Sequence, residues 1–146
     1  MSTTQAVTLT RNATLEDLGA MLAFDAYASI NPGRGVFLAE AVDKQQCLVA
    51  VQSGAVIGYL VLTYSFFDYG LVALVVTSPA HQRQGVALTL LVAAQAACQT
   101  EKLFITTNQS NLPSRKLIAK AGFVPSGVIE NLDEQDPELI YFKRIR

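Results

Sequence analysis

The stretch that most constrains the fold is residues 70–98, GLVALVVTSPAHQRQGVALTLLVAAQAAC. Residues 71–76 form an unbroken apolar run of strand length that is rich in β-branched side chains, which is typical of a buried central strand. Residues 77–79, Thr-Ser-Pro, end this strand, and apolar residues then recur at helical spacing as far as Cys98. The stretch therefore predicts a strand that leads through a short turn into the N-terminus of a helix.

The turn itself, residues 82–87 with the sequence QRQGVA, has the composition of an anion site. The first turn of a helix leaves backbone N–H groups unpaired and carries a partial positive charge, which suits a phosphate. Gly85 and Ala87 remove side-chain bulk where an anion approaches, and Arg83 adds a full positive charge. No Gly-Lys-Ser/Thr follows, and one glycine stands where a dinucleotide fingerprint has three, so both of those motifs are excluded. A pyrophosphate site is predicted, with an ordinary strand-to-helix turn as the alternative.

Composition limits the classes of protein to consider. The 146 residues are 51% hydrophobic, enough for one packed core, so we expect a single domain over residues 1–146. The net charge of −1 shows no excess of positive charge that would attract nucleic acid or an anionic membrane, so neither is expected as a partner. We find no signal-peptide pattern or apolar run of membrane-spanning length, which favours a cytoplasmic location. Cys47 and Cys98 are interpreted as reduced core thiols, and no metal site is expected. His81, the one histidine, is interpreted as a surface-loop residue, with a catalytic base as the alternative.

The remainder of the chain alternates strand and helix patterns. Thr14 opens a capping-box-like helix start, the segment 31–33 breaks the chain before a second helix through Ala41, and Gly122 marks a helix end. Turns are expected at 52–54, as in a hairpin, and at 65–70. The strands expected are 7–10, 47–51, 55–64, 71–76, 103–107, 123–130 and 138–144, and the other helices are 14–28, the one reaching Cys98, and 111–121.

Two segments resemble the signatures of the GNAT acetyltransferases. Gln82, Gly85 and Ala87 match the acyl-CoA-binding pattern Q/R-x-x-G-x-G/A, which follows a strand and a proline. Residues 111–123, NLPSRKLIAKAGF, are similar to the second signature, N-x-x-A-x-x-L-Y-x-K-x-G-F. The element order β-α-α-β-β-β-α-β-α-β-β also matches, so the resemblance covers nearly the whole chain. It implies an α+β (α/β/α) GNAT fold, a mixed, mostly antiparallel sheet of about seven strands flanked by four helices.

The resemblance also implies a reaction, the direct transfer of an acetyl group from acetyl-CoA to a primary amine of a small molecule or protein. The backbones of residues 75–77 would bind the pantetheine arm, and the amides from residue 83 or 84 to residue 88 would hold the pyrophosphate. Asn111 and Ser114 would contact the cofactor near its pantetheine and thiol end. A backbone N–H near Val76 would stabilise the developing oxyanion. The cofactor-binding residues so implied are Val75, Val76, Thr77, Arg83, Gln84, Gly85, Val86, Ala87, Leu88, Asn111 and Ser114.

The sequence departs from the family pattern at both usual acid–base positions. An alkylammonium has a pKa of about 10 and must lose a proton before its nitrogen attacks. Thr106 stands where many relatives have a glutamate base, and Ile118 replaces the tyrosine that protonates the departing thiolate. Substitute catalytic candidates are Asp68 and the phenols Tyr64 and Tyr141, each with a structural role as its alternative.

Acidic residues before the last expected strand offer another way to attract a cationic amine, with a solvated loop as the alternative; they are Asp133, Glu134, Asp136 and Glu138. Because Thr106 and Ile118 lack acid–base groups, a non-catalytic acyl-CoA-binding or sensing module is the second hypothesis for the function. A protein-interaction domain without a ligand is the third. The resemblance further suggests a homodimer, since terminal strands often pair across dimers in this family. The identity of the amine stays open.

Overall fold

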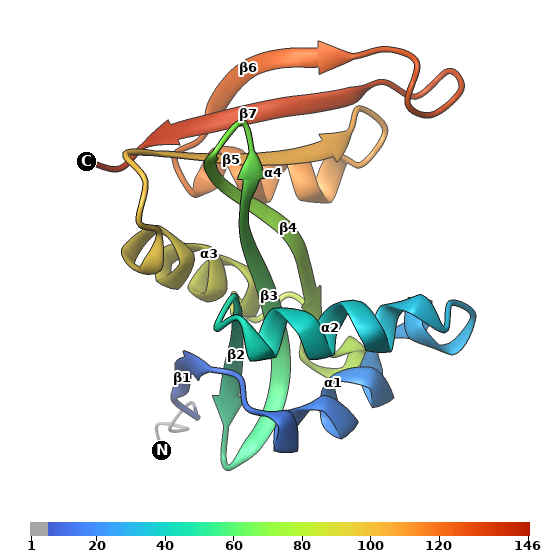
Figure 1. The fold of residues 1–146 in the computed structure, drawn as a ribbon, viewed down its shortest axis with the longest axis vertical. Coiled ribbons are helices and arrows are strands. Elements are labelled where there is room, and N and C mark those ends of the chain that lie inside the picture. The colour runs from blue at the N-terminus through green and yellow to red at the C-terminus, as the bar shows by residue number, and fades with distance from the viewer. Residues whose placement is uncertain (1–5) are drawn as a thin grey trace, which may run out of the picture.

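A computed structural model describes residues 6–146 (Figure 1). These residues form a seven-stranded sheet of order β1-β2-β3-β4-β5-β7-β6, in which β4 and β5 are parallel and every other neighbouring pair is antiparallel. The predicted mixed, mostly antiparallel sheet is therefore confirmed. The strands are β1 (Thr8–Asn12), β2 (Cys47–Gln52), β3 (Ala55–Phe66), β4 (Tyr69–Thr77), β5 (Lys102–Asn108), β6 (Val124–Ile129) and β7 (Glu138–Arg144).

Helices cover the sheet on both faces (Figure 1). The α-helices are α1 (Leu18–Phe24), α2 (Gly33–Asp43), α3 (Val86–Ala97) and α4 (Leu112–Lys120), and short 3-10 helices lie at Leu15–Asp17, Ala26–Ser29 and Pro79–His81. On one face α3 and α4 pack in a core that includes Leu90, Leu103 and Ile118. On the other face α1 and α2 pack in a second core around Met21 and Tyr59. This second pair of helices lies over β2 and β3, and the β5–β7 part of that face carries no helix within the described residues.

The strands β4 and β5 stop pairing with each other partway along their length. They pair from Gly70 to Val72 and from Leu103 to Ile105, and then both continue unpaired with one another. A β-bulge at Ala73 accompanies the parting, because Val72 and Leu74 face consecutive residues of β3. In the part of the chain that the structure describes, β4 from Leu74 onward therefore has a strand partner only in β3.

The structure corrects the predicted helix over residues 14–28. The chain is helical in three short pieces, because Asp25 adopts an extended ψ of 102° and ends α1. Its side chain accepts a hydrogen bond from the Tyr27 amide, 3.1 Å away, and so starts a new 3-10 turn. Aspartate competes in this way with the helical backbone for hydrogen bonds, which explains the break.

The turn predicted over residues 65–70 is shorter than expected. Phe66 pairs directly with Tyr69, so that Phe67 and Asp68 alone form the hairpin turn, both with left-handed φ angles of 52° and 66°. Two-residue hairpin turns require this conformation. The result is a longer β3–β4 hairpin that carries Asp68 at its tip.

Candidate functional site

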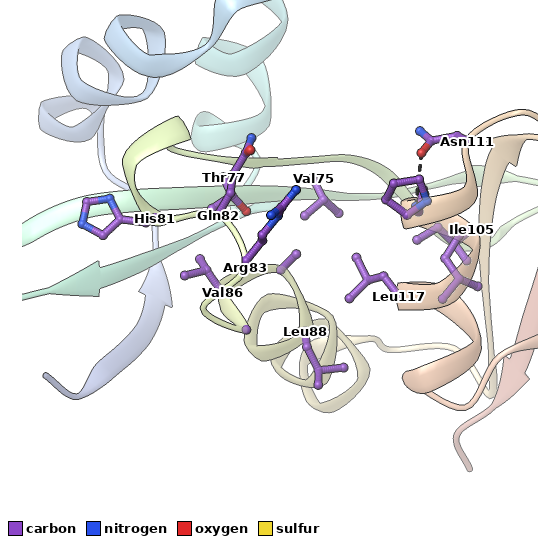
Figure 2. A pocket seen from close by; sticks show the side chains of 15 residues that line it. Val75, Thr77, His81, Gln82, Arg83, Val86, Leu88, Ile105, Asn111 and Leu117 are labelled. Atoms are coloured by element: carbon purple, nitrogen blue, oxygen red, sulfur yellow. Dashed lines mark hydrogen bonds between the residues drawn. The ribbon is translucent and has the colours of Figure 1, made fainter. Parts of the chain in front are cut away.

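A cleft of about 610 Å³ lies between the C-terminal half of β4, the turn before α3, and α4 (Figure 2). Nine of the eleven predicted cofactor-binding residues line it: Val75, Thr77, Arg83, Gly85, Val86, Ala87, Leu88, Asn111 and Ser114. The other two do not. The Val76 side chain packs in the core beneath α1 and α2, and Gln84 lines a neighbouring hollow with Thr8 and Gln52.

The turn before α3 presents unpaired backbone amides. Gly85 is the N-cap with a φ of +79°, and Arg83 is also left-handed, with a φ of 65°. The first helical hydrogen bond runs from the Thr89 amide to the Gly85 carbonyl, 3.0 Å away, and no side chain caps the helix. Within residues 6–146, no acceptor meets the amides at positions 86–88. Together with the helix dipole, these amides and the Arg83 guanidinium form a strong anion-binding surface.

The opposite wall of the cleft is the start of α4. Asn111 is the N-cap of this helix, and its side-chain oxygen accepts a hydrogen bond from the Ser114 amide, 3.1 Å away. This capping role accounts for an asparagine in the short connection between β5 and α4, and it was missed in the sequence. Ile118, at the position of the family's tyrosine, also lines the cleft and is fully buried, so it brings no proton donor.

His81 lies in the connection between β4 and α3, but it is less exposed than a surface-loop residue was expected to be. His81 is half-buried at the end of the 3-10 helix that precedes the turn, and it lines the cleft (Figure 2). Its Nδ1 is buried without a hydrogen-bond partner in the part of the chain that the structure describes. Such a buried, unpartnered nitrogen is costly, and a ligand in the cleft would offset that cost.

The structure does not bring the three catalytic candidates together, and none of them lines the cleft. The Tyr64 phenol oxygen accepts a hydrogen bond from the Gln99 amide at 3.1 Å, and burial raises the pKa of this phenol. Asp68 lies in the β3–β4 turn, and Tyr141 is buried in the core beneath α3 and α4. Their catalytic role stays a prediction that this geometry does not support.

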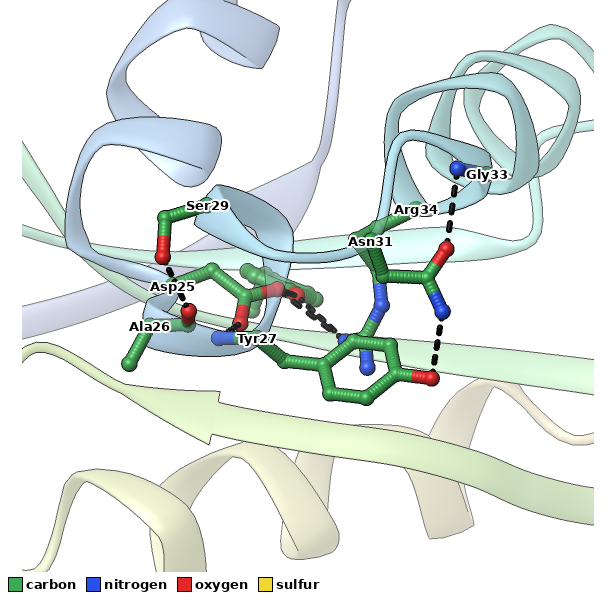
Figure 3. A network of polar contacts seen from close by, with 8 residues as sticks. Asp25, Ala26, Tyr27, Ser29, Asn31, Gly33 and Arg34 are labelled. Carbon is green, nitrogen blue, oxygen red and sulfur yellow. Dashed lines mark hydrogen bonds and ion pairs between the residues drawn. The ribbon is translucent and has the colours of Figure 1, made fainter.

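A buried polar network lies on the other face of the sheet (Figure 3). The carboxylate of Asp25, 4% exposed, accepts hydrogen bonds from the Tyr27 amide at 3.1 Å, from Nη1 of Arg34 at 3.0 Å, and from the Tyr59 hydroxyl. The Arg34 guanidinium also stacks over the Tyr27 ring, 4.3 Å from its centroid. Burial and the bond to Asp25 raise the pKa of Tyr59. The network connects the segment between α1 and α2 to β3. No local sequence pattern predicts this network.

The cysteines have the expected surroundings. Cys47 and Cys98 are free and buried, and burial raises the pKa of the Cys47 thiol to about 12. Over residues 6–146, no group of three or more His, Cys, Asp or Glu side chains is arranged to hold a metal ion. In the same range, no helix is both long and apolar enough to cross a membrane.

Comparison with known proteins identifies the class to which this fold and cleft belong. The family model described as the acetyltransferase (GNAT) family matches residues 16–123. The chain therefore belongs to the GNAT acetyltransferase family, and the family and fold predicted from the two signatures are confirmed.

Solved structures agree over almost the whole chain. A GNAT-family acetyltransferase from Bacillus cereus ATCC 10987 is 30% identical, with a TM-score of 0.89 over 94% of this chain and 97% of that one. A putative acetyltransferase from Salmonella typhimurium, solved with its cofactor acetyl-CoA, is 17% identical, with a TM-score of 0.77 over 95% and 94%. The ribosomal-protein-S18-alanine N-acetyltransferase from Escherichia coli has the same values, 17%, 0.77, 95% and 94%. No curated protein matches the chain.

Proposed function

We propose that this protein is an acetyl-CoA-dependent N-acetyltransferase that moves the acetyl group directly to a primary amine of a small molecule or protein. The observation that carries the proposal is the set of unpaired amides at positions 86–88, which line a cleft of about 610 Å³ beside the parted strand β4. Membership of the GNAT family supports it, as does the similar Salmonella protein solved with acetyl-CoA.

Acetyl-CoA fits the cleft along its length. The diphosphate would accept hydrogen bonds from the amides of residues 83–88, with Arg83 balancing its charge. The pantetheine arm would then run beside Val75, Val76 and Thr77, adding as a strand where β4 has no partner on the β5 side. Asn111 and Ser114 would contact the thiol end from α4, and the buried Nδ1 of His81 offers a further polar contact.

The chemistry asked of the chain is limited. The acceptor ammonium loses a proton, its nitrogen forms a bond to the thioester carbonyl carbon, and the carbon–sulfur bond then breaks. A backbone N–H near Val76 would donate to the oxyanion of the tetrahedral intermediate. A thiol with a pKa of about 8.5 leaves without an acid catalyst, which is consistent with Ile118 at the tyrosine position. No acyl-enzyme is proposed, because neither cysteine lines the cleft.

A non-catalytic acyl-CoA-binding or sensing module is the second candidate, and Thr106 and Ile118 favour it because neither can transfer a proton at the usual positions. Thiol release from acetyl-CoA over a panel of primary amines separates the two functions, with calorimetric binding of acetyl-CoA measured in parallel. Turnover that depends on the amine supports the transferase. Binding without any amine-dependent thiol release supports the module, and failure to bind CoA esters excludes both.

Two further expectations accompany the proposal. The two free, buried cysteines suit a reducing, cytoplasmic location. A homodimer would use β6, which is exposed along its whole length and, among the described strands, pairs only with β7. Sedimentation of the purified protein tests the dimer.

A further inference from the structure

The strands β5 and β7 place one unused carboxylate beside Thr106. In the register of this pair, Thr106 lies opposite Ile140, and Asn108 lies opposite Glu138. Side chains alternate between the faces of a strand, and Leu139 and Tyr141 point into the core beneath α3 and α4. Glu138 therefore lies on the opposite face together with Thr106, as its diagonal neighbour. Diagonal neighbours on paired strands are about 7–8 Å apart.

This face is the one from which an acceptor would approach. The other face is occupied by α3, α4 and the cofactor cleft between them. Here α1 and α2 cover β2 and β3, and no helix of residues 6–146 covers the neighbouring face of β5 and β7 (Figure 1). An acetyl group held along β4 beyond Val72, where β5 no longer pairs with it, would lie between these two regions.

Three other carboxylates, those of Asp25, Asp133 and Asp136, are already committed to structural bonds, and Glu134 is exposed in the loop before β7. Asp25 is buried and saturated by its network (Figure 3). Asp133 accepts a hydrogen bond from Nδ2 of Asn108 at 2.8 Å, and Asp136 accepts two from Ser110, at 3.0 Å from its amide and 2.6 Å from its hydroxyl. The two loop aspartates thus tie the β6–β7 loop to the end of β5.

Glu138 differs from these residues in having no structural task. It is half-buried, and within residues 6–146 its side chain makes no hydrogen bond or ion pair. Its cross-strand neighbours are Asn108 on β5 and Ile129 on β6, neither of them a cation. A carboxylate kept unpaired beside a reaction site is available to an ammonium group.

We propose that Glu138 accepts the proton of the acceptor's ammonium group, the task that Thr106 cannot perform; this rests on the transferase function proposed above. The ammonium gives one proton to the Glu138 carboxylate, and the freed nitrogen lone pair attacks the thioester carbonyl carbon. The carbon–sulfur bond breaks as the intermediate collapses, and the second nitrogen proton passes through solvent to the departing thiolate. The products are the amide and the free thiol, and Glu138 returns its proton to solvent.

Aromatic side chains on the same face guide the choice of probes. Phe104 lies next to Thr106 on this face, with its ring centroid 6.0 Å from that of Phe142 and 5.1 Å from that of Phe66. We therefore choose two amines with the same aryl body and nearly the same shape. Phenethylamine is an ammonium ion at about pH 7.5, whereas O-benzylhydroxylamine is already neutral there.

The test compares Glu138→Gln with the unchanged protein on both probes. Removing the proton acceptor should lower kcat/KM for phenethylamine by about 100-fold or more, since general base catalysis contributes 10²–10⁴-fold. For O-benzylhydroxylamine, which has no ammonium proton to lose, the loss should stay below about fivefold on the same reasoning. The affinity for acetyl-CoA should be unchanged by calorimetry. Glu130→Gln, which removes an exposed carboxylate just after β6, is the matched control and should behave as the unchanged protein.

An equal loss on both amines, or no loss on either, overturns the role of Glu138. The same holds if Asp68→Asn, rather than Glu138→Gln, shows the selective loss. A failure of the proposed function is measured separately, on the unchanged protein: if it binds acetyl-CoA but releases no thiol with either probe or with any primary amine of the panel, the transfer reaction is refuted, and the role of Glu138 with it. Thermal unfolding of each variant checks that the fold is retained.

Discussion

Gly85→Glu tests whether the turn before α3 holds the diphosphate of acetyl-CoA. Gly85 has a φ of +79°, and a Cβ built there meets no atom within 4 Å. The new side chain thus fits without a clash, and the cost to the fold is the left-handed backbone, about 1–2 kcal/mol. A change of this size lowers the melting temperature by roughly 3–7 °C for a chain of this length. The variant should fold.

Binding should suffer far more than folding. The added carboxylate would sit beside the unpaired amides at positions 86–88, where the diphosphate is proposed to lie. Two like charges about 4 Å apart repel by about 1 kcal/mol in water and about 4 kcal/mol at an effective dielectric constant of 20. Because the diphosphate carries more than one charge, a loss of about 3 kcal/mol is a moderate value, and it weakens binding by more than about 100-fold.

Calorimetric titration with acetyl-CoA measures this loss, and Gly54→Glu is the matched control. Gly54 has nearly the same backbone angle, a φ of +80°, and equally open surroundings, but it lies in the β2–β3 turn outside the cleft. The control should lose similar stability and bind acetyl-CoA as the unchanged protein does. If folded Gly85→Glu binds within about threefold of the unchanged protein, the diphosphate does not occupy this turn.

Three further predictions concern the fold. The hydrogen bond from Arg11 lowers the pKa of Asp17 from 3.8 to about 2, so the charged carboxylate stabilises the fold above about pH 4 and this contribution is lost as the pH falls toward 2. Urea unfolding should show the stability gap between the unchanged protein and Asp17→Asn narrowing over that range; a constant gap would contradict this. Tyr59→Phe removes a hydroxyl that donates to buried Asp25 and should cost about 1–3 kcal/mol in urea unfolding, and a cost below about 0.5 kcal/mol would show that the bond is unimportant. Because burial raises the pKa of Cys47 to about 12, its thiol should react with a disulfide reagent near pH 8 only on unfolding, and rapid labelling of the native protein would refute this.

The local signals in the sequence predicted the elements around the cofactor cleft well. An apolar run, a helical apolar period and a glycine at the turn are enough to place β4, Gly85 and α3, because each depends on residues close in the chain. The hairpin at Ser53 and Gly54 was predictable for the same reason, since both residues adopt the left-handed angles of a two-residue turn.

The features that the sequence did not reveal depend on distant partners. The helix over residues 14–28 breaks at Asp25 because its carboxylate bonds to Arg34 and to Tyr59 on β3, which a local pattern cannot show. Likewise, Glu138 lies near Thr106 only because of the register of β5 with β7, which makes diagonal neighbours of two residues that are 32 positions apart in the sequence. The side chain of Asn111 was assigned to the cofactor, and its cap on Ser114 became visible only with the start of α4 in place.

The parting of β4 and β5 also bears on the order of events in turnover. The cofactor would enter beside α3 and α4, and the amine would arrive from the face of α1 and α2. Neither substrate would therefore block the binding of the other. Both would be held at once, so initial-rate plots at several fixed amine concentrations should intersect rather than run parallel, and free coenzyme A should compete with acetyl-CoA without displacing the amine.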